Sequence, residues 1–246
     1  GPGVRPVQAL GVVGGGRLGR MFVQGAKQMG YFTAVLAPDA ASPAGLVSHH
    51  HVKTAYADPA GLTQLAACSA AITTEFENVP AATAMILAAR RPVLPEYKTL
   101  EATQDRLVEK DFVKRLDIGT ADYAEVSSAA ALRAAISKIG LPAVIKTRRF
   151  GYDGKGQAII RDGDDPDQVW EDLATKSAIL EAFIPFEREI SVIAARSATG
   201  PGEGFDVTEN EHRDHILKIP RAPAQPPSHR AEPARPSAGS HAGRRR

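Results

Sequence analysis

The chain has 246 residues, of which 43% are hydrophobic and 24% charged, with a single cysteine. This length suffices for one or two domains with a hydrophobic core. The composition excludes a wholly disordered, collagen-like or disulfide-stabilised protein. Because the longest apolar runs are far shorter than the roughly 20 residues of a membrane helix and no secretory signal opens the chain, we expect a cytoplasmic protein without a membrane partner.

The formal net charge of +2 is unevenly distributed. From residue 221 to 246, six arginines face one acid, Glu232, so this segment carries +5 and the remaining chain −3. The basic character therefore belongs to the tail and gives no reason to expect nucleic acid as a partner. The tail contains five prolines and no Val, Ile, Leu, Met, Phe, Trp or Tyr, which predicts disorder. An RNA-binding arm is the alternative, but no aromatic residues are present to stack on bases.

Strand and helix patterns alternate in the first part of the chain. Strands are predicted at 9–13, 31–37 and 71–74, and helices at 18–29 and 80–89. This alternation predicts an α/β protein whose Rossmann-like, parallel sheet extends to about residue 95. Further on, the patterns predict helices at 103–116, 128–139 and 166–174, a hairpin with arms 142–147 and 157–160, and strands at 178–183, 189–195 and 205–208. We expect the last of these strands to lie at an unpaired sheet edge.

The first motif is a glycine-rich turn between the first strand and the first helix. Residues 14–19 read GGGRLG, and Asp39 follows twenty residues after Gly19. Glycines at these positions permit a tight turn whose N–H groups approach a phosphate, and the acid would bind a ribose. The motif alone favours NAD binding, although any Rossmann-like domain needs a tight first turn.

Two acids close the strand at 71–74. Glu75 and Glu77 lie in the sequence TTEFEN, and ligands of open α/β sheets bind at the carboxyl ends of strands. Glu75 and Glu77 are therefore candidate substrate contacts. The alternative is that they only solvate the end of the strand.

The most specific motif is the glycine-rich, basic sequence KTRRFGYDGKGQ at residues 146–157. It is not a Walker A loop, because no Ser or Thr follows Lys155. A glycine-rich hairpin can still cover a triphosphate, with backbone amides and lysines neutralising its charge. A solvated basic turn would explain the glycines, but not Lys146 at the end of the apolar run 143–145.

Two weaker patterns lie outside these motifs. Residues 181–184, EAFI, end a predicted strand and could contact adenine through the backbone, with Glu189 available for ribose hydroxyls. The tract His49–His51 resembles a metal-binding tract, but consecutive residues on an extended chain alternate faces, so we interpret it as structural.

Taken together and in order, these motifs resemble one family of ATP-grasp enzymes. The sequences GGGRLGRM, TTEFENVP, VIKTRRFGYDGKGQ, EAFIPFEREISVI and VTENEHRDHIL are similar to those of the N5-carboxyaminoimidazole ribonucleotide synthetases. The resemblance extends from about residue 10 to 219. It implies a Rossmann-like domain at 1–95, linker helices and a small central domain at 96–177, the first part of the ATP-grasp C-terminal domain at 178–220, and the tail at 221–246. The ATP-grasp fold would therefore be incomplete in this chain.

The resemblance also implies the site residues. It places ATP at Arg106, Lys146, Gly151, Tyr152, Asp153, Gly154, Lys155, Gly156, Gln157, Glu181, Ala182, Phe183, Ile184, Glu189 and His212. It places the ribonucleotide at Gly16, Arg17, Leu18, Glu75, Tyr152, Asp153 and Lys155, with Asp153 and Lys155 as catalytic residues. No metal ligand is assigned, because the acidic Mg²⁺ ligands of the family belong to later strands.

The activity implied by the resemblance is ATP-dependent carboxylation of 5-aminoimidazole ribonucleotide with bicarbonate, through carboxyphosphate, in purine biosynthesis. ATP and Mg²⁺ would be required, and the intact protein would be a homodimer. Because the sequence after Ile219 departs from the family, we expect a truncated or frameshifted, catalytically inactive chain. An NAD(P)-dependent oxidoreductase and a non-catalytic nucleotide-binding remnant are the alternatives.

Overall fold

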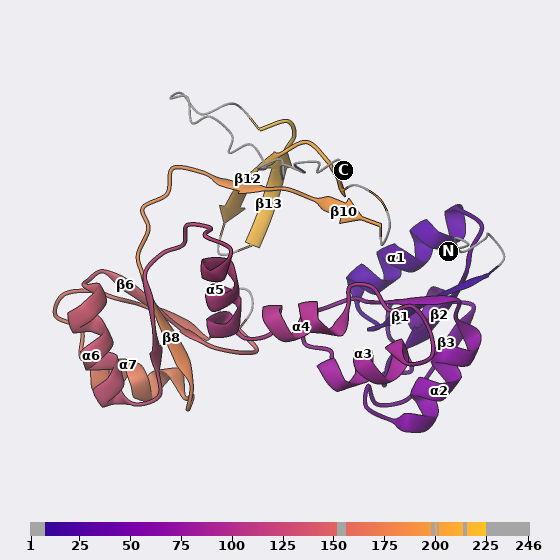
Figure 1. The fold of residues 1–246 in the computed structure, drawn as a ribbon, viewed down its shortest axis with the longest axis horizontal. Helices are drawn as coiled ribbons and strands as arrows, with labels where there is room; N and C mark the ends of the chain where they lie inside the picture. Colours follow the sequence, from indigo (N-terminus) through magenta and orange to yellow (C-terminus); the bar gives the residue numbers. More distant parts are fainter. Residues whose placement is uncertain (1–7, 152–155, 198–199, 201, 214–215, 225–246) are drawn as a thin grey trace, which may run out of the picture. The chain divides into compact units, whose positions relative to one another are not determined.

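A computed structural model describes residues 8–151, 156–197, 200, 202–213 and 216–224 (Figure 1). The chain divides into two compact units, Gly1–Ile184 and Pro185–Arg246, and each is described by itself. Within the described ranges, no helix has the length and apolar character needed to cross a membrane. Most of the predicted tail, from residue 225, lies outside the described residues.

The first unit begins with a parallel four-stranded sheet in the order β3-β2-β1-β4. Its elements are β1 (Ala9–Val13), α1 (Arg17–Gln28), β2 (Phe32–Leu36), the 3₁₀ turn η1 (Gly45–Val47), β3 (His50–Val52), α2 (Pro59–Cys68), β4 (Ala71–Thr74) and α3 (Ala81–Ala88). The apolar strands are buried on both faces, as parallel sheets require. This confirms the Rossmann-like fold predicted from the alternation.

Successive residues of each strand enter different cores. Val12 and Val35 pack with Val23 of α1, whereas Val13 and Leu36 belong to the cluster that contains Leu62 and Leu65 of α2. The helices therefore cover both faces of the sheet. The sheet is doubly wound, with the carboxyl ends of β1 and β4 side by side.

Strand β3 was not predicted, because its sequence HHV offers little apolar pattern. It pairs with β2. Two histidines of the tract hydrogen-bond to the sheet or to the residue after β2: the His49 Nδ1 lies 3.1 Å from the Thr33 backbone nitrogen, and the His51 Nε2 lies 3.2 Å from the Ala37 carbonyl oxygen. Burial, and then the charges of Lys27 and His50, lower the pKa of His49. The histidine tract is thus structural, and no metal-binding group of three or more His, Cys, Asp or Glu occurs in the described ranges.

The second part of this unit is an antiparallel sheet in the order β5-β8-β6-β7, with α6 and α7 on one face (Figure 1). The elements are β5 (Tyr123–Val126), α6 (Ala129–Ile139), β6 (Ala143–Thr147), β7 (Gln157–Ile160), α7 (Pro166–Leu173) and β8 (Ala178–Ala182). The Ser128 side chain accepts from the Ala131 N–H and begins α6. The hairpin of β6 and β7 agrees with the prediction, and its register pairs Lys146 with Gln157.

The single helix predicted at 103–116 is wrong at its start. The chain forms α4 (Tyr97–Thr103) and α5 (Arg106–Arg115), separated by Gln104 and Asp105. The Asp105 carboxylate accepts from the Leu107 N–H at 3.0 Å and the Val108 N–H at 3.5 Å. This N-cap begins a new helix at Arg106.

The described residues of the second unit form five short strands: β9 (Glu189–Ser191), β10 (Ala194–Arg196), β11 (Gly202–Gly204), β12 (Thr208–Arg213) and β13 (Ile216–Arg221). They form a three-stranded antiparallel sheet, β13-β12-β9, and a two-stranded pair, β10-β11.

Two expectations for this unit are wrong. The predicted strand 189–195 is interrupted between β9 and β10. Phe205 precedes β12 rather than belonging to it, and Thr208 begins the central strand of three instead of an unpaired edge. Most of β12 was not predicted, because its polar sequence TENEHR lacks the apolar alternation that is typical of a strand.

Candidate nucleotide and substrate site

The antiparallel sheet β5-β8-β6-β7 carries three predicted ATP residues on the face opposite α6 and α7. Ala143 and Ile145 of β6 pack in the core under the two helices, so the alternate residues Val144 and Lys146 lie on the other face. Pairing places Glu181 of β8 opposite Val144 and Gln157 of β7 opposite Lys146. Lys146, Gln157 and Glu181 therefore share one face, as a ligand lying across the strands would require.

The Glu181 carboxylate is the electrostatic centre of this face. Its Oε2 atom lies 3.1 Å from the Lys146 Nζ and 3.3 Å from the Lys110 Nζ, and only 9% of the Glu181 side chain is exposed. The pairing holds the Lys146 ammonium in a defined position on the sheet, and the Lys146 side chain is 23% exposed. Two cations beside one carboxylate leave a net positive charge, which favours an anionic ligand.

Sequence reasoning missed Lys110. This residue lies four positions after Arg106 on α5, so both project from the same side of that helix. The Lys110 Nζ also donates to the Thr120 Oγ1 at 2.7 Å. The i,i+4 spacing from Arg106 was the available signal, but only the tertiary structure brings Lys110 to Glu181.

Two cations of the glycine-rich motif have structural partners. Arg148 binds the Asp105 carboxylate through Nε at 2.9 Å and Nη2 at 2.7 Å, and Glu125 through Nη1 at 2.6 Å. The Arg149 Nη2 donates to the Gln104 Oε1 at 2.8 Å. Arg148 is therefore paired rather than simply solvated, whereas Arg149 is exposed, and both contacts fasten the start of the loop to the segment before α5.

The rest of the loop is only partly described. The Arg106 Nη2 lies 3.5 Å from the Gly151 carbonyl, and Gly156 has a φ of +70°, a conformation that favours glycine. A Cβ atom at Gly156 would also lie 2.7 Å from the Thr147 Oγ1. Tyr152, Asp153, Gly154 and Lys155, including both predicted catalytic residues, lie outside the described residues.

The segment predicted to contact adenine follows directly along β8. The Ala182 N–H donates to the Asp122 carbonyl at 2.8 Å, and the Phe183 N–H donates to the Pro142 carbonyl at 3.2 Å. The side chains of Phe183 and Ile184 are 41% and 51% exposed. This segment therefore presents apolar surface next to Glu181, which suits a base.

The four predicted ribonucleotide residues that the structure describes, Gly16, Arg17, Leu18 and Glu75, lie at the first turn of α1. The Glu75 Oε2 accepts from the Gly16 N–H at 2.7 Å, and Arg17 and Leu18 are exposed beside it. Burial, and next the charge of Glu75, raise the pKa of Tyr56. Asp39, the acid of the NAD pattern, instead accepts from the Ala41 N–H at 2.8 Å.

The second unit holds the two remaining predicted ATP residues, Glu189 and His212. The His212 Nδ1 lies 3.2 Å from the Glu189 Oε1, and the Asn210 Nδ2 lies 3.4 Å from the same oxygen. Both Glu189 and His212 line a hollow of about 420 Å³, together with Phe186, Glu187, Arg188, Glu209, Asn210, Glu211 and Arg221. Carboxylates in such a hollow can accept hydrogen bonds from sugar hydroxyls.

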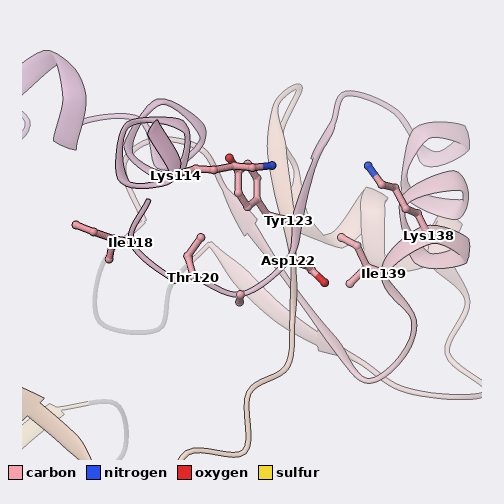
Figure 2. A pocket seen from close by; sticks show the side chains of 9 residues that line it. Lys114, Ile118, Thr120, Asp122, Tyr123, Lys138 and Ile139 are labelled. Atoms are coloured by element: carbon pink, nitrogen blue, oxygen red, sulfur yellow. The ribbon is translucent and has the colours of Figure 1, made fainter. Parts of the chain in front are cut away.

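A hollow of about 450 Å³ lies elsewhere, where the end of α5, the loop before β5 and the end of α6 meet (Figure 2). Its lining includes Lys114, Thr120, Asp122, Tyr123 and Lys138, and shares no member with the predicted ATP residues of the described chain. This hollow therefore does not coincide with the face that carries Lys146, Gln157 and Glu181.

Two family models match the chain. Residues 7–104 match the ribonucleotide synthetase preATP-grasp domain, and residues 111–240 match the ATP-grasp domain.

Several similar curated proteins are described as N5-carboxyaminoimidazole ribonucleotide synthases. The N5-carboxyaminoimidazole ribonucleotide synthase of Brucella melitensis is 42% identical over 237 residues, covering 96% of this chain and 66% of that protein. The synthase of Pseudomonas aeruginosa is 41% identical over 212 residues, covering 85% of this chain and 58% of that protein. The chain thus spans less than two thirds of the length of these relatives.

Solved structures of N5-carboxyaminoimidazole ribonucleotide synthetases also match the chain. An N5-carboxyaminoimidazole ribonucleotide synthetase in complex with ADP matches with a TM-score of 0.86 at 36% identity, covering 92% of this chain and 60% of that one. The Aspergillus clavatus synthase in complex with ADP and 5-aminoimidazole ribonucleotide matches with a TM-score of 0.80 at 25% identity, covering 89% and 58%.

Proposed function

Because the chain belongs to the ATP-grasp family, we propose that its protein is an ATP-dependent ligase that carboxylates 5-aminoimidazole ribonucleotide with bicarbonate, forming N5-carboxyaminoimidazole ribonucleotide in purine biosynthesis. The observation that carries the proposal for this chain is the shared sheet face of Lys146, Gln157 and Glu181, next to the glycine-rich loop. The relatives favour this activity over an NAD(P)-dependent oxidoreductase.

The proposed chemistry explains why cations and a covering loop are needed. Bicarbonate is a poor electrophile. Transfer of the γ-phosphoryl group of ATP to a bicarbonate oxygen releases ADP and gives carboxyphosphate, whose phosphate is a good leaving group. The exocyclic amine of the ribonucleotide then attacks the carboxyl carbon, phosphate departs and the amine loses a proton. Holding two anionic substrates together and excluding water are the tasks of the protein.

In this proposal the described residues of the first unit bind and orient ATP. Lys146, held by Glu181, neutralises phosphate charge, and Phe183 and Ile184 provide the apolar surface for adenine. Glu189 of the second unit stays a prediction for the ribose hydroxyls. Asp153 and Lys155 stay predictions for the carboxylation step, since they lie outside the described residues.

We also propose that Mg²⁺ accompanies ATP and that the intact protein is a cytoplasmic homodimer. The described residues do not fit a metal centre, because no group of three or more His, Cys, Asp or Glu among them could hold a metal ion. No step of the reaction is therefore assigned to a metal held by this part of the chain.

The test is ATP binding by calorimetry. Lys146→Ala removes a charged hydrogen-bond donor, so we expect a loss of about 1.5–3 kcal/mol, or roughly 10–150-fold in Kd. Lys138→Ala is the matched control, because it removes the same charge from the exposed end of α6, on the covered side of the sheet. Absence of ATP binding by the wild-type chain, or equal affinity in wild type and Lys146→Ala, would contradict the proposal.

A further inference from the structure

A carboxylate of the chain itself occupies the N-terminus of α1. The Gly16 N–H donates to the Glu75 Oε2 at 2.7 Å. In a dinucleotide-binding turn, N–H groups at this position bind the pyrophosphate. In this molecule, an anion 59 residues away in sequence has taken that place.

The glycines of the turn make room for Glu75. A Cβ atom at Gly14 would lie 2.5 Å from the Glu75 Oε2, and one at Gly19 would lie 2.9 Å from the same oxygen. A Cβ at Gly16 would overlap the Glu75 Oε1. With Glu75 in this position, a side chain at any of these three glycines would force the carboxylate to move, and Gly14 also has a φ of +124°, a conformation that favours glycine.

The sheet delivers Glu75 to this position. β4 lies beside β1, and the Glu75 N–H donates to the Val13 carbonyl at 3.0 Å, so the pairing of the two strands continues one residue beyond β4. The Glu75 side chain therefore stands over the turn that follows β1. Backbone pairing, rather than chance orientation of an exposed side chain, defines its location.

We propose that Glu75 determines the ligand specificity of the glycine turn by excluding phosphate groups. Its carboxylate satisfies the Gly16 N–H and complements the positive end of the helix dipole. An incoming phosphate would have to displace this carboxylate or lie beside it, against like-charge repulsion. The turn is consequently closed to dinucleotides despite matching their sequence pattern. This goes beyond the proposed ligase activity and does not depend on ATP binding.

The experiment observes the turn directly by NMR. Residues 14–16 contain the only consecutive glycines of the sequence. Labelling glycine with ¹³C at the carbonyl and ¹⁵N at the amide therefore leaves two signals in an HNCO spectrum, from the amides of Gly15 and Gly16. Inorganic pyrophosphate is titrated into the wild-type chain and into Glu75→Ala, Glu75→Thr and Glu75→Gln. Binding of pyrophosphate elsewhere, including the glycine-rich loop, does not contribute to these signals unless it reaches the turn.

In the wild type, we expect no saturable movement of the two signals at millimolar pyrophosphate. Glu75→Ala and Glu75→Thr remove the carboxylate, and the signals should then move saturably, with an apparent affinity at least about tenfold above that of the wild type. Glu75→Gln keeps an oxygen that can accept from Gly16 but loses the charge, so its apparent affinity for pyrophosphate should lie between those of the wild type and Glu75→Ala.

Circular dichroism melting checks that each variant is folded, and Thr serves as the second neutral variant if Ala destabilises the strand end. Saturable movement in the wild type would overturn the proposal, as would a folded Glu75→Ala or Glu75→Thr variant whose signals stay unmoved. Loss of ATP binding, by contrast, would concern the proposed function alone.

Discussion

Asp105 combines two roles whose contributions can be separated by substitution. Its carboxylate caps α5 and forms the bidentate pair with Arg148, which anchors the glycine-rich loop. Asparagine caps helices about as well as aspartate, so Asp105→Asn removes mainly the ionic pair. Asp105→Ala removes both the cap and the pair.

The magnitudes follow from exposure and geometry. A charged hydrogen-bonded pair contributes about 1.5–3 kcal/mol. The Arg148 and Asp105 side chains are 20% and 12% exposed, and Arg148 keeps Glu125 as a partner, so we expect about 1–2 kcal/mol for Asp105→Asn. The lost cap adds about 1 kcal/mol, which predicts about 2–3 kcal/mol for Asp105→Ala.

Trp170 provides the assay. It is the only tryptophan and packs against the buried cluster under α6 and α7, so urea unfolding followed by its fluorescence reports on the unit that carries the pair. The free energy of unfolding should decrease in the order wild type, Asp105→Asn, Asp105→Ala. A midpoint for Asp105→Asn equal to that of the wild type would refute the ionic contribution, and equal midpoints for the two variants would refute the cap.

The pH dependence gives an independent check. Burial acts to raise the pKa of Asp105, but hydrogen bonds from Arg148 and the backbone of α5 outweigh it and hold the pKa below its ordinary value. A lowered pKa in the folded state stabilises the protein above the unfolded pKa of about 4, and this contribution disappears as pH falls through the folded pKa. The difference between wild type and Asp105→Asn should therefore shrink below about pH 4. A difference that persists unchanged in more acidic solution would contradict the assignment.

Three further outcomes are expected. Leu132→Ala, at a fully buried position of α6, should destabilise the chain by about 2–5 kcal/mol in the Trp170 assay, and a change below about 1 kcal/mol would contradict the packing. Removal of residues 185–246 should leave that unfolding transition in place, because the buried clusters of the described chain all lie in the first unit; loss of the transition would show that the second unit is needed. NADH fluorescence should not change when the chain is added, since Glu75 occupies the glycine turn, and a saturable change at micromolar NADH would favour the oxidoreductase alternative.

Local sequence determined the parts of the fold that depend on short-range patterns. The βα alternation produced the Rossmann-like sheet, because apolar runs of strand length separated by amphipathic helices can bury both faces in that arrangement. Two β-rich arms around glycines predicted the hairpin at 143–160. In the structure, the register of this hairpin pairs Lys146 with Gln157. Strands β3 and β12 escaped prediction because neither carries an apolar alternation of its own, and pairing with neighbours stabilises them instead.

The candidate sites depended on contacts between distant residues. Arg148 meets Asp105 across 43 positions, Lys146 meets Glu181 across 35, and Gly16 meets Glu75 across 59. A charged side chain looks the same in sequence whether it faces solvent, a ligand or another residue, because its partner is chosen by strand order and register. Only the tertiary structure could therefore show that Arg148 and Arg149 anchor the loop, that Lys110 joins Lys146 at one carboxylate, and that a glycine turn with the pattern of a phosphate site holds an internal glutamate.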